Sequence, residues 1–214
     1  MYAWNVENHE FVFENSRIQP LTSVECLGAI LEQKCKPKLQ VQKICDKLKA
    51  IRILTAQNFR SRSFEILQKM YTAFILPHLD FVSFLWFNDK PMVLNPIERE
   101  FKAFWRLSPN KKPPKDLTWP REHLIANDLG LLHDIESGSS PIRFADHFER
   151  STVNPDRILT VDWSLACKRD VFSERAKRYW NQMDKSDKIL SKKVFKTKVI
   201  ERLKNDSSFG VIHI

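Results

Sequence analysis

Glycine is scarce in this sequence, with 4 residues among 214. Loops that cradle a phosphate need glycine where the backbone approaches the ligand, and neither GxGxxG nor GxxxxGK(S/T) occurs in the chain. The shortage excludes the phosphate-binding loops of Rossmann and P-loop proteins. We therefore predict that the protein uses no cofactor.

Metal-binding spacings are also absent. Cys26, Cys35, Cys45 and Cys167 include no CxxC pair, and the six histidines include no HExxH pair. A zinc site needs ligands clustered at short spacings, so no metal site is expected. The cysteines are predicted to be isolated, buried thiols in a reducing compartment.

The sequence has no long hydrophobic run. The longest apolar stretch, around residues 74–87, is interrupted by Pro77, His78 and Asp80, which argues against a membrane span. The first seven residues (MYAWNVE) lack the basic and apolar regions of a signal peptide. We expect a soluble intracellular protein with no membrane partner, in the nucleus rather than the cytoplasm.

Positive charge is abundant and unevenly placed. The net charge is +9, while residues 34–69 and residues 168–204 each carry a net charge of +8, so the rest of the chain carries −7. Two basic blocks in an otherwise acidic chain favour a polyanionic partner. The alternative is that both blocks are ordinary lysine-rich helix faces in contact with solvent.

The first thirty residues have the pattern of strands. Residues 11–13 (FVF) are a short β-prone run, residues 14–17 supply a turn, and residues 18–21 are predicted to pair back. Residues 24–31 (VECLGAIL) are predicted to form a further strand with Gly28 inside it. Because so small a sheet is marginally stable alone, we expect the following helices or a second chain to cover it.

From Pro37 onward the apolar spacing becomes helical. The first predicted helix has an apolar face of Val41, Ile44, Cys45, Leu48, Ile51 and Thr55. The second has a stripe of Phe64, Leu67, Met70, Tyr71, Phe74 and Ile75, and Pro77 is expected to bend or stop it. The third is predicted to begin at Asn95, with Pro96 in the first turn and with Ile97, Phe101, Phe104 and Trp105 facing inward.

The remaining chain alternates between connectors and helices. The proline-rich residues 108–122 are predicted to be a connector, followed by a short helix from Arg121 that ends at Gly130. Residues 136–141 are predicted to be a loop, and the last helices are expected at residues 171–181 and 191–204. The predicted fold class is mainly α, with a small N-terminal β element and a C-terminal helical extension.

Several of these segments carry a recognisable pattern in a fixed order. They are residues 27–31 (LGAIL), 44–48 (ICDKL), 71–83 (YTAFILPHLDFVS) and Trp86, followed by residues 172–181 (FSERAKRYWN) and 195–196 (FK). Together they resemble the C-terminal part of a LINE-type (non-LTR) retrotransposon reverse transcriptase. The resemblance covers about residues 11–203, with poor similarity at residues 134–165.

The resemblance implies four segments. Residues 1–33 would be a β element similar to the last palm strands, and residues 34–107 a thumb-like helical bundle. Residues 108–165 would be a connector with a short helix and loops, and residues 166–214 a basic C-terminal helical segment. The catalytic palm of the family would precede these segments.

The sequence does not support polymerase chemistry. Polymerisation needs two Mg²⁺ ions held by paired aspartates, and no Asp-Asp dipeptide occurs. Residues 144–147 (FADH) are faintly similar to the family's tyrosine-alanine-aspartate-aspartate motif, but they follow the thumb-like segment and end in His147. We therefore predict a non-catalytic protein, either a domesticated fragment or a truncated copy, and not an enzyme.

In the family the thumb contacts the backbone of the template–primer duplex, so the resemblance implies that the basic helices bind RNA or an RNA–DNA duplex with low sequence specificity. Phosphate contacts need cations but no base-reading motif. Arg60 and Arg62 are the strongest candidates, because a guanidinium group can bind two phosphate oxygens. The full set of predicted nucleic-acid-binding residues is Lys43, Lys47, Lys49, Arg52, Arg60, Arg62, Arg175, Arg178, Lys192 and Lys193.

One other function remains open. The chain is alternatively a domesticated interaction module that binds a protein partner, or a second copy of itself, through the exposed edge of the N-terminal strands.

Phe59 beside Arg60 is the one local pairing of an aromatic ring with a cation that suits base stacking. A hydrolase built from His133, Asp134 and a serine has no support in the spacing.

Overall fold

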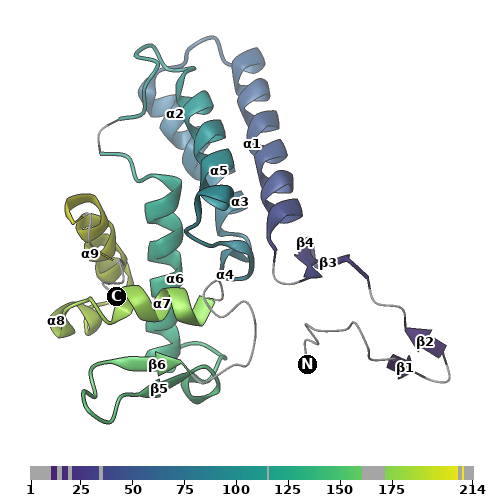
Figure 1. The fold of residues 1–214 in the computed structure, drawn as a ribbon. Helices are drawn as coiled ribbons and strands as arrows, with labels where there is room; N and C mark the ends of the chain where they lie inside the picture. The colour runs from purple at the N-terminus through teal and green to yellow at the C-terminus, as the bar shows by residue number, and fades with distance from the viewer. Residues whose placement is uncertain are drawn as a thin grey trace.

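The computed structural model describes residues 11–13, 16–18, 21–33, 36–114, 116–160, 172–206 and 209, and these residues are mainly helical, as predicted. Figure 1 shows α1, α2 and α5 side by side in the upper half, with α6 running down into a lower half that contains α7, α8, α9 and the β5–β6 hairpin. The elements, in chain order, are β1 (Phe11–Phe13), β2 (Ser16–Ile18), β3 (Ser23–Cys26), β4 (Ala29–Glu32), α1 (Lys38–Asn58), α2 (Phe64–Met70), the π-helical turn η2 (Tyr71–Ile75), α3 (Leu76–Asp80), α4 (Ser83–Trp86), α5 (Pro91–Trp105), α6 (Pro120–Glu136), the 3-10 turn η3 (Phe144–Asp146), β5 (Phe148–Arg150), β6 (Ile158–Thr160), α7 (Phe172–Trp180), α8 (Lys185–Lys188) and α9 (Lys192–Asn205).

The described strands form three antiparallel hairpins, β1–β2, β3–β4 and β5–β6. The prediction of one strand over residues 24–31 is wrong, because the chain reverses at Leu27 and Gly28. Their φ angles of 49° and 86° are both positive, as a tight two-residue hairpin turn requires. Gly28 therefore makes the turn instead of interrupting a strand.

The following helix covers the β3–β4 hairpin on one side. Ala29 is buried there, and the Ile30 N–H donates to Gln40 Oε1 of α1 at 2.9 Å. The other side of the hairpin is open, since Val24 and Leu27 are exposed. The expectation that the helices cover this element thus holds for one face only.

The apolar faces predicted for the first and third helices are confirmed. Val41, Ile44, Cys45, Leu48 and Thr55 of α1 are buried, and Ile51 is half-buried. In α5, which packs against α1, the buried residues are Ile97, Phe101, Phe104 and Trp105, whereas Arg99, Lys102 and Arg106 are exposed.

The predicted start of α5 at Asn95 is wrong, since the helix begins at Pro91 and contains Pro96. Either proline suits the first turn of a helix. The earlier start buries Val93 and Leu94 in the core, at the cost of the one backbone hydrogen bond that Pro96 cannot donate.

The stripe predicted for the second helix is only partly buried. Leu67, Tyr71 and Ile75 are in the core, but Phe64 and Phe74 are exposed. The π-helical turn at residues 71–75, in which the Leu76 N–H donates to the carbonyl of Tyr71, is wider than an α-turn and shifts the spacing on which the prediction rested. The chain continues as helix past Pro77 to Asp80, so Pro77 does not stop it.

Helix α6 is longer than predicted, because Gly130 does not end it. A Cβ atom at this position would lie 3.1 Å from Cδ of Lys196 in α9, so the glycine permits close packing of the two helices. The loop expected after residue 136 and the two C-terminal helices are confirmed. The β5–β6 hairpin and the short α8 carry no signal that the sequence analysis detected.

The cysteine prediction is half right among the described residues. Cys45 is buried, and burial raises the pKa of its thiol to about 11. Cys26 is exposed at the end of β3, which contradicts the prediction for that residue. Cys35 and Cys167 lie outside the described residues.

One buried apolar cluster includes side chains from α1 to α7 and from α9. A charged pair is embedded in it: Nε of Arg175 (α7) donates to Oδ2 of Asp128 (α6) at 2.9 Å, and the two side chains are 1% and 3% exposed. The Arg175 guanidinium also lies over the ring of Phe87 at 5.0 Å and within 3.5 Å of the Phe84 carbonyl oxygen. This pair therefore fixes α7 to α6 and to the residues around α4.

We expect Arg175→Met to lower the free energy of unfolding by roughly 3–5 kcal/mol, because it leaves the Asp128 carboxylate unpaired in the core. Urea denaturation followed by circular dichroism measures the change. The double variant Arg175→Met/Asp128→Leu removes both charges and should recover most of the loss. A single variant as stable as the parent protein would contradict this role.

Candidate nucleic-acid interface

The predicted cations of α1 do not share one surface. Lys43 is engaged with the β3–β4 hairpin, since its Nζ lies 2.5 Å from Glu25 Oε1 and 2.9 Å from the Gly28 carbonyl oxygen. Lys47 and Lys49 are exposed, but residues two apart lie about 200° apart around a helix axis. These lysines therefore cannot contact the same row of phosphates.

The arginines of the first block differ in their availability. Arg52 is partly buried, with its Nη2 3.6 Å from Glu100 Oε2 of α5. Arg62 donates from Nη2 to the Ala56 carbonyl at 2.7 Å and from Nε to the Phe59 carbonyl at 3.3 Å, so it caps the C-terminus of α1. Arg60, between them in the chain, is exposed.

The C-terminal candidates are mostly engaged in internal pairs. The prediction that Arg175 binds nucleic acid is wrong, because this side chain is buried against Asp128 and no phosphate can reach it. Arg178 pairs with Asp89 at 3.0 Å, and Lys192 pairs with Asp134 of α6. Lys193 is exposed on α9.

The two basic blocks are thus not joined through the residues predicted from the sequence. Figure 1 shows α1 and α9 on opposite sides of the molecule, with α5 and α6 between them. Of the ten candidates, Lys47, Lys49, Arg60 and Lys193 are exposed without an ion pair or side-chain hydrogen bond within the described part of the chain. The structure brings these four to separate places.

A different group of cations does gather at one end of the helical body. Here the connection from α1 to α2 meets the loop that follows α5, at the top of Figure 1. Among the described residues, no carboxylate lies within ion-pair distance of any member. We call this group the basic end: Arg60, Arg62, Arg106, Lys111 and Lys112.

Aromatic packing holds the two loops of the basic end together. The rings of Phe64, the first residue of α2, and Trp105, the last residue of α5, are stacked with centroids 5.8 Å apart. The Ser108 hydroxyl lies 2.7 Å from the Trp105 carbonyl oxygen and 3.3 Å from that of Lys112, which closes the loop after α5. The spacing of the cations is therefore set by the folded core.

Three members of the basic end, Arg106, Lys111 and Lys112, are not among the predicted nucleic-acid-binding residues. Lys111 and Lys112 lie in the segment predicted to be a connector. The signal that could have found the two lysines is the Lys-Lys dipeptide itself, in a short segment without acidic residues after the third predicted helix.

The Pro-His-Leu-Asp segment contributes a polar cluster that joins α3, α6 and α9. Oδ1 of Asp80 lies 2.5 Å from His123 Nε2 and accepts from Asn127 Nδ2 at 2.5 Å, and Lys196 donates to the Asn127 side chain. Burial acts to raise the pKa of Asp80, but these hydrogen bonds and the charges of His123 and Lys196 outweigh it and hold the pKa below its usual value. The ionised carboxylate therefore stabilises the fold.

Because the folded-state pKa of Asp80 is lowered, its stabilising contribution exists above the pKa of an unfolded aspartate, about 4, and is lost as the pH falls through the folded-state value. We expect Asp80→Asn to lower the free energy of unfolding at pH 6, and the difference from the parent protein to disappear towards pH 2. Denaturation curves collected across this range measure it. A difference that is constant with pH would contradict the assignment.

Other candidate chemistry finds no geometric support. His133 Nε2 lies 2.9 Å from the Leu190 carbonyl oxygen while Asp134 pairs with Lys192, so the two do not form a hydrolytic pair. Asp146 of the 144–147 segment pairs with Arg143 at 3.0 Å. Within the described ranges, no three His, Cys, Asp or Glu side chains are grouped to hold a metal ion, and no helix is long and apolar enough to cross a membrane.

Comparison with known proteins adds no assignment, since no family model, curated protein or solved structure matches the chain.

Proposed function

We propose that this protein binds the sugar-phosphate backbone of nucleic acid, RNA or an RNA–DNA duplex, through the basic end. The observation that carries the proposal is the gathering of Arg60, Arg62, Arg106, Lys111 and Lys112 from two loops at one end of the helical body. Within the described residues, none of these side chains is neutralised by a carboxylate. A polyanion is the partner that such a surface fits.

The resemblance to the end of a LINE-type reverse transcriptase supports the same class of partner. In that family the thumb holds the nucleic acid while another domain performs the chemistry. The proposal is accordingly for a binding protein of low sequence specificity and not for an enzyme. Backbone contacts of this kind position a nucleic acid without reading its bases.

The test is fluorescence anisotropy with a labelled RNA and an RNA–DNA duplex, over a salt titration from about 50 to 200 mM, where phosphate contacts lose affinity steeply. The variant Arg60→Ala/Lys111→Ala/Lys112→Ala should weaken binding by roughly tenfold or more and reduce the salt slope by about 3. Arg62 is left intact because it caps α1.

The matched control is Lys47→Ala/Lys49→Ala/Lys193→Ala, which removes the same charge at exposed sites away from the basic end. It should bind nearly as well as the parent protein. If the two triple variants lose the same affinity, the binding is diffuse and the basic end is not the site. Absence of binding at about 50 mM salt would overturn the proposal.

A second candidate function, protein interaction through the N-terminal strands, is favoured by the β3–β4 hairpin. This hairpin has only two strands and leaves Val24 and Leu27 exposed, and an unpaired strand edge invites another strand. A second copy of the chain is the occupant we consider here. Light scattering at micromolar concentration tests this second function. Pairing through the β3–β4 hairpin requires a dimer, and Val24→Lys should disrupt that dimer.

A further inference from the structure

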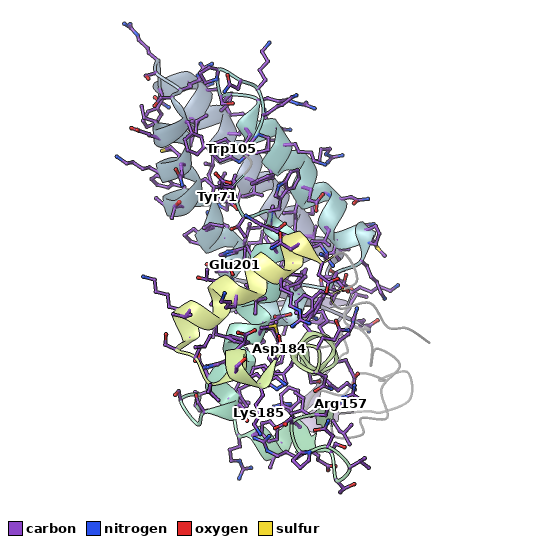
Figure 2. All side chains as sticks on the ribbon, turned by 90° about the vertical axis from the view of Figure 1, so that its left-hand side faces the viewer. Tyr71, Trp105, Arg157, Asp184, Lys185 and Glu201 are labelled. Atoms are coloured by element: carbon purple, nitrogen blue, oxygen red, sulfur yellow. The ribbon has the colours of Figure 1, made fainter. Side chains whose placement is uncertain are left out.

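A cleft adjoins the basic end, between α2–η2 and the segment that leads into α6. Its volume is about 410 Å³, and its lining includes Phe64, Gln68, Tyr71, Thr72, Leu117 and Thr118. Figure 2 faces this side of the molecule and shows Tyr71 and Trp105 in its upper half, above α9. The volume is within the range of small-molecule sites.

The walls of the cleft combine an aromatic face with hydrogen-bonding groups. Phe64 is 41% exposed, and its ring is supported from behind by the stacked ring of Trp105. The Tyr71 hydroxyl donates to the Thr118 carbonyl at 3.3 Å, which fixes the opposite wall. The exposed Gln68 carboxamide has no hydrogen-bond partner within the described residues, so its donors and acceptor are available to a ligand.

Cations from both basic blocks lie near residues that line the cleft. Arg62 of the first block and Lys112 each lie two residues before a lining residue, Phe64 and Pro114. Lys204 of α9, in the second block, donates from Nζ to the carbonyl of Asp116 at 2.9 Å, and Asp116 also lines the cleft. The hollow with an aromatic wall therefore has cations of both blocks close to its lining.

We propose that the cleft takes one unpaired base of a single-stranded nucleic acid, whose flanking phosphates lie on the basic end and at Lys204. This inference rests on the proposed function and makes it more specific. A base is flat, stacks on an aromatic ring such as Phe64, and hydrogen-bonds through its edge to an amide such as Gln68. The bases of a duplex are already paired and stacked, so a duplex reaches the basic end but not the cleft.

The experiment compares three labelled oligonucleotides of equal length: a single strand, the same strand with abasic residues throughout, and a duplex. The single strand and the abasic strand carry the same phosphate charge. We expect the single strand to bind roughly tenfold more tightly than the abasic strand, as stacking of a base on an aromatic side chain provides. The single strand should also bind more tightly than the duplex.

The outcomes separate the two proposals. Equal affinity of the single strand and the abasic strand, with a steep salt dependence, would overturn the cleft inference and leave backbone binding at the basic end intact. The cleft inference also fails if the duplex binds as tightly as the single strand. Absence of binding by all three at about 50 mM salt overturns the proposed function itself.

A variant locates the base within the molecule. Gln68→Trp fills the cleft from an exposed position on α2, whereas Ala73→Trp places the same bulk at an exposed position that lines an adjoining hollow but not the cleft. With Gln68→Trp, the single strand and the abasic strand should bind about equally well, and the salt slope should not change. With Ala73→Trp, the single strand should keep its roughly tenfold tighter binding. A preference that survives Gln68→Trp overturns the placement, and the abasic comparison on the parent protein decides the inference if this variant does not fold.

Discussion

The buried pair of Arg175 and Asp128 is the interaction on which the arrangement of the lower half depends. Helix α6 packs against α3, α4, α5, α7 and α9, and this pair fixes α7 to it in one register. The attraction between two buried charges does little more than offset the free-energy cost of removing them from water. Separating them inside the core, however, is costly. Any packing that misaligns the two helices is therefore penalised. Helix α9 packs on the same central helix, and its Phe195 ring lies 5.5 Å from that of Trp180 in α7.

The fold redistributes the positive charge that the sequence places in two blocks. Much of it is used internally: Lys43 holds the β3–β4 hairpin, and Arg178 and Lys192 pair with acidic residues from distant segments. Cations used in this way do not define a binding surface, even where their density in the chain is high. The charge that remains available is concentrated instead where two loops meet. It includes Arg106, Lys111 and Lys112, none of which lies in either block.

The sequence was informative wherever one helix face meets the core without interruption. The 3.6-residue spacing identified the buried faces of α1 and α5, because burial follows directly from periodicity. It failed at Phe74, where a π-helical turn changes the spacing, and at Asn95, where a second proline offered an earlier start. The pair of Arg175 with Asp128 joins residues 47 apart, and no local pattern predicts such a contact. The candidate site depends on contacts of this long-range kind, such as the stacking of Phe64 on Trp105, and so it required the folded chain.

The cleft distinguishes the proposed contact with nucleic acid from that of a surface that only follows a duplex. A surface that only follows a duplex needs cations spaced along a helix, and the cations of α1 lack that arrangement, since Lys47 and Lys49 face different directions and Lys43 is engaged. An aromatic wall with cations close to it is suited to a strand whose bases are free. Lys204 of the second block reaches the segment before α6 because α9 packs along α6. The packing of these two helices thus brings a cation of the C-terminal block to the cleft that adjoins the basic end.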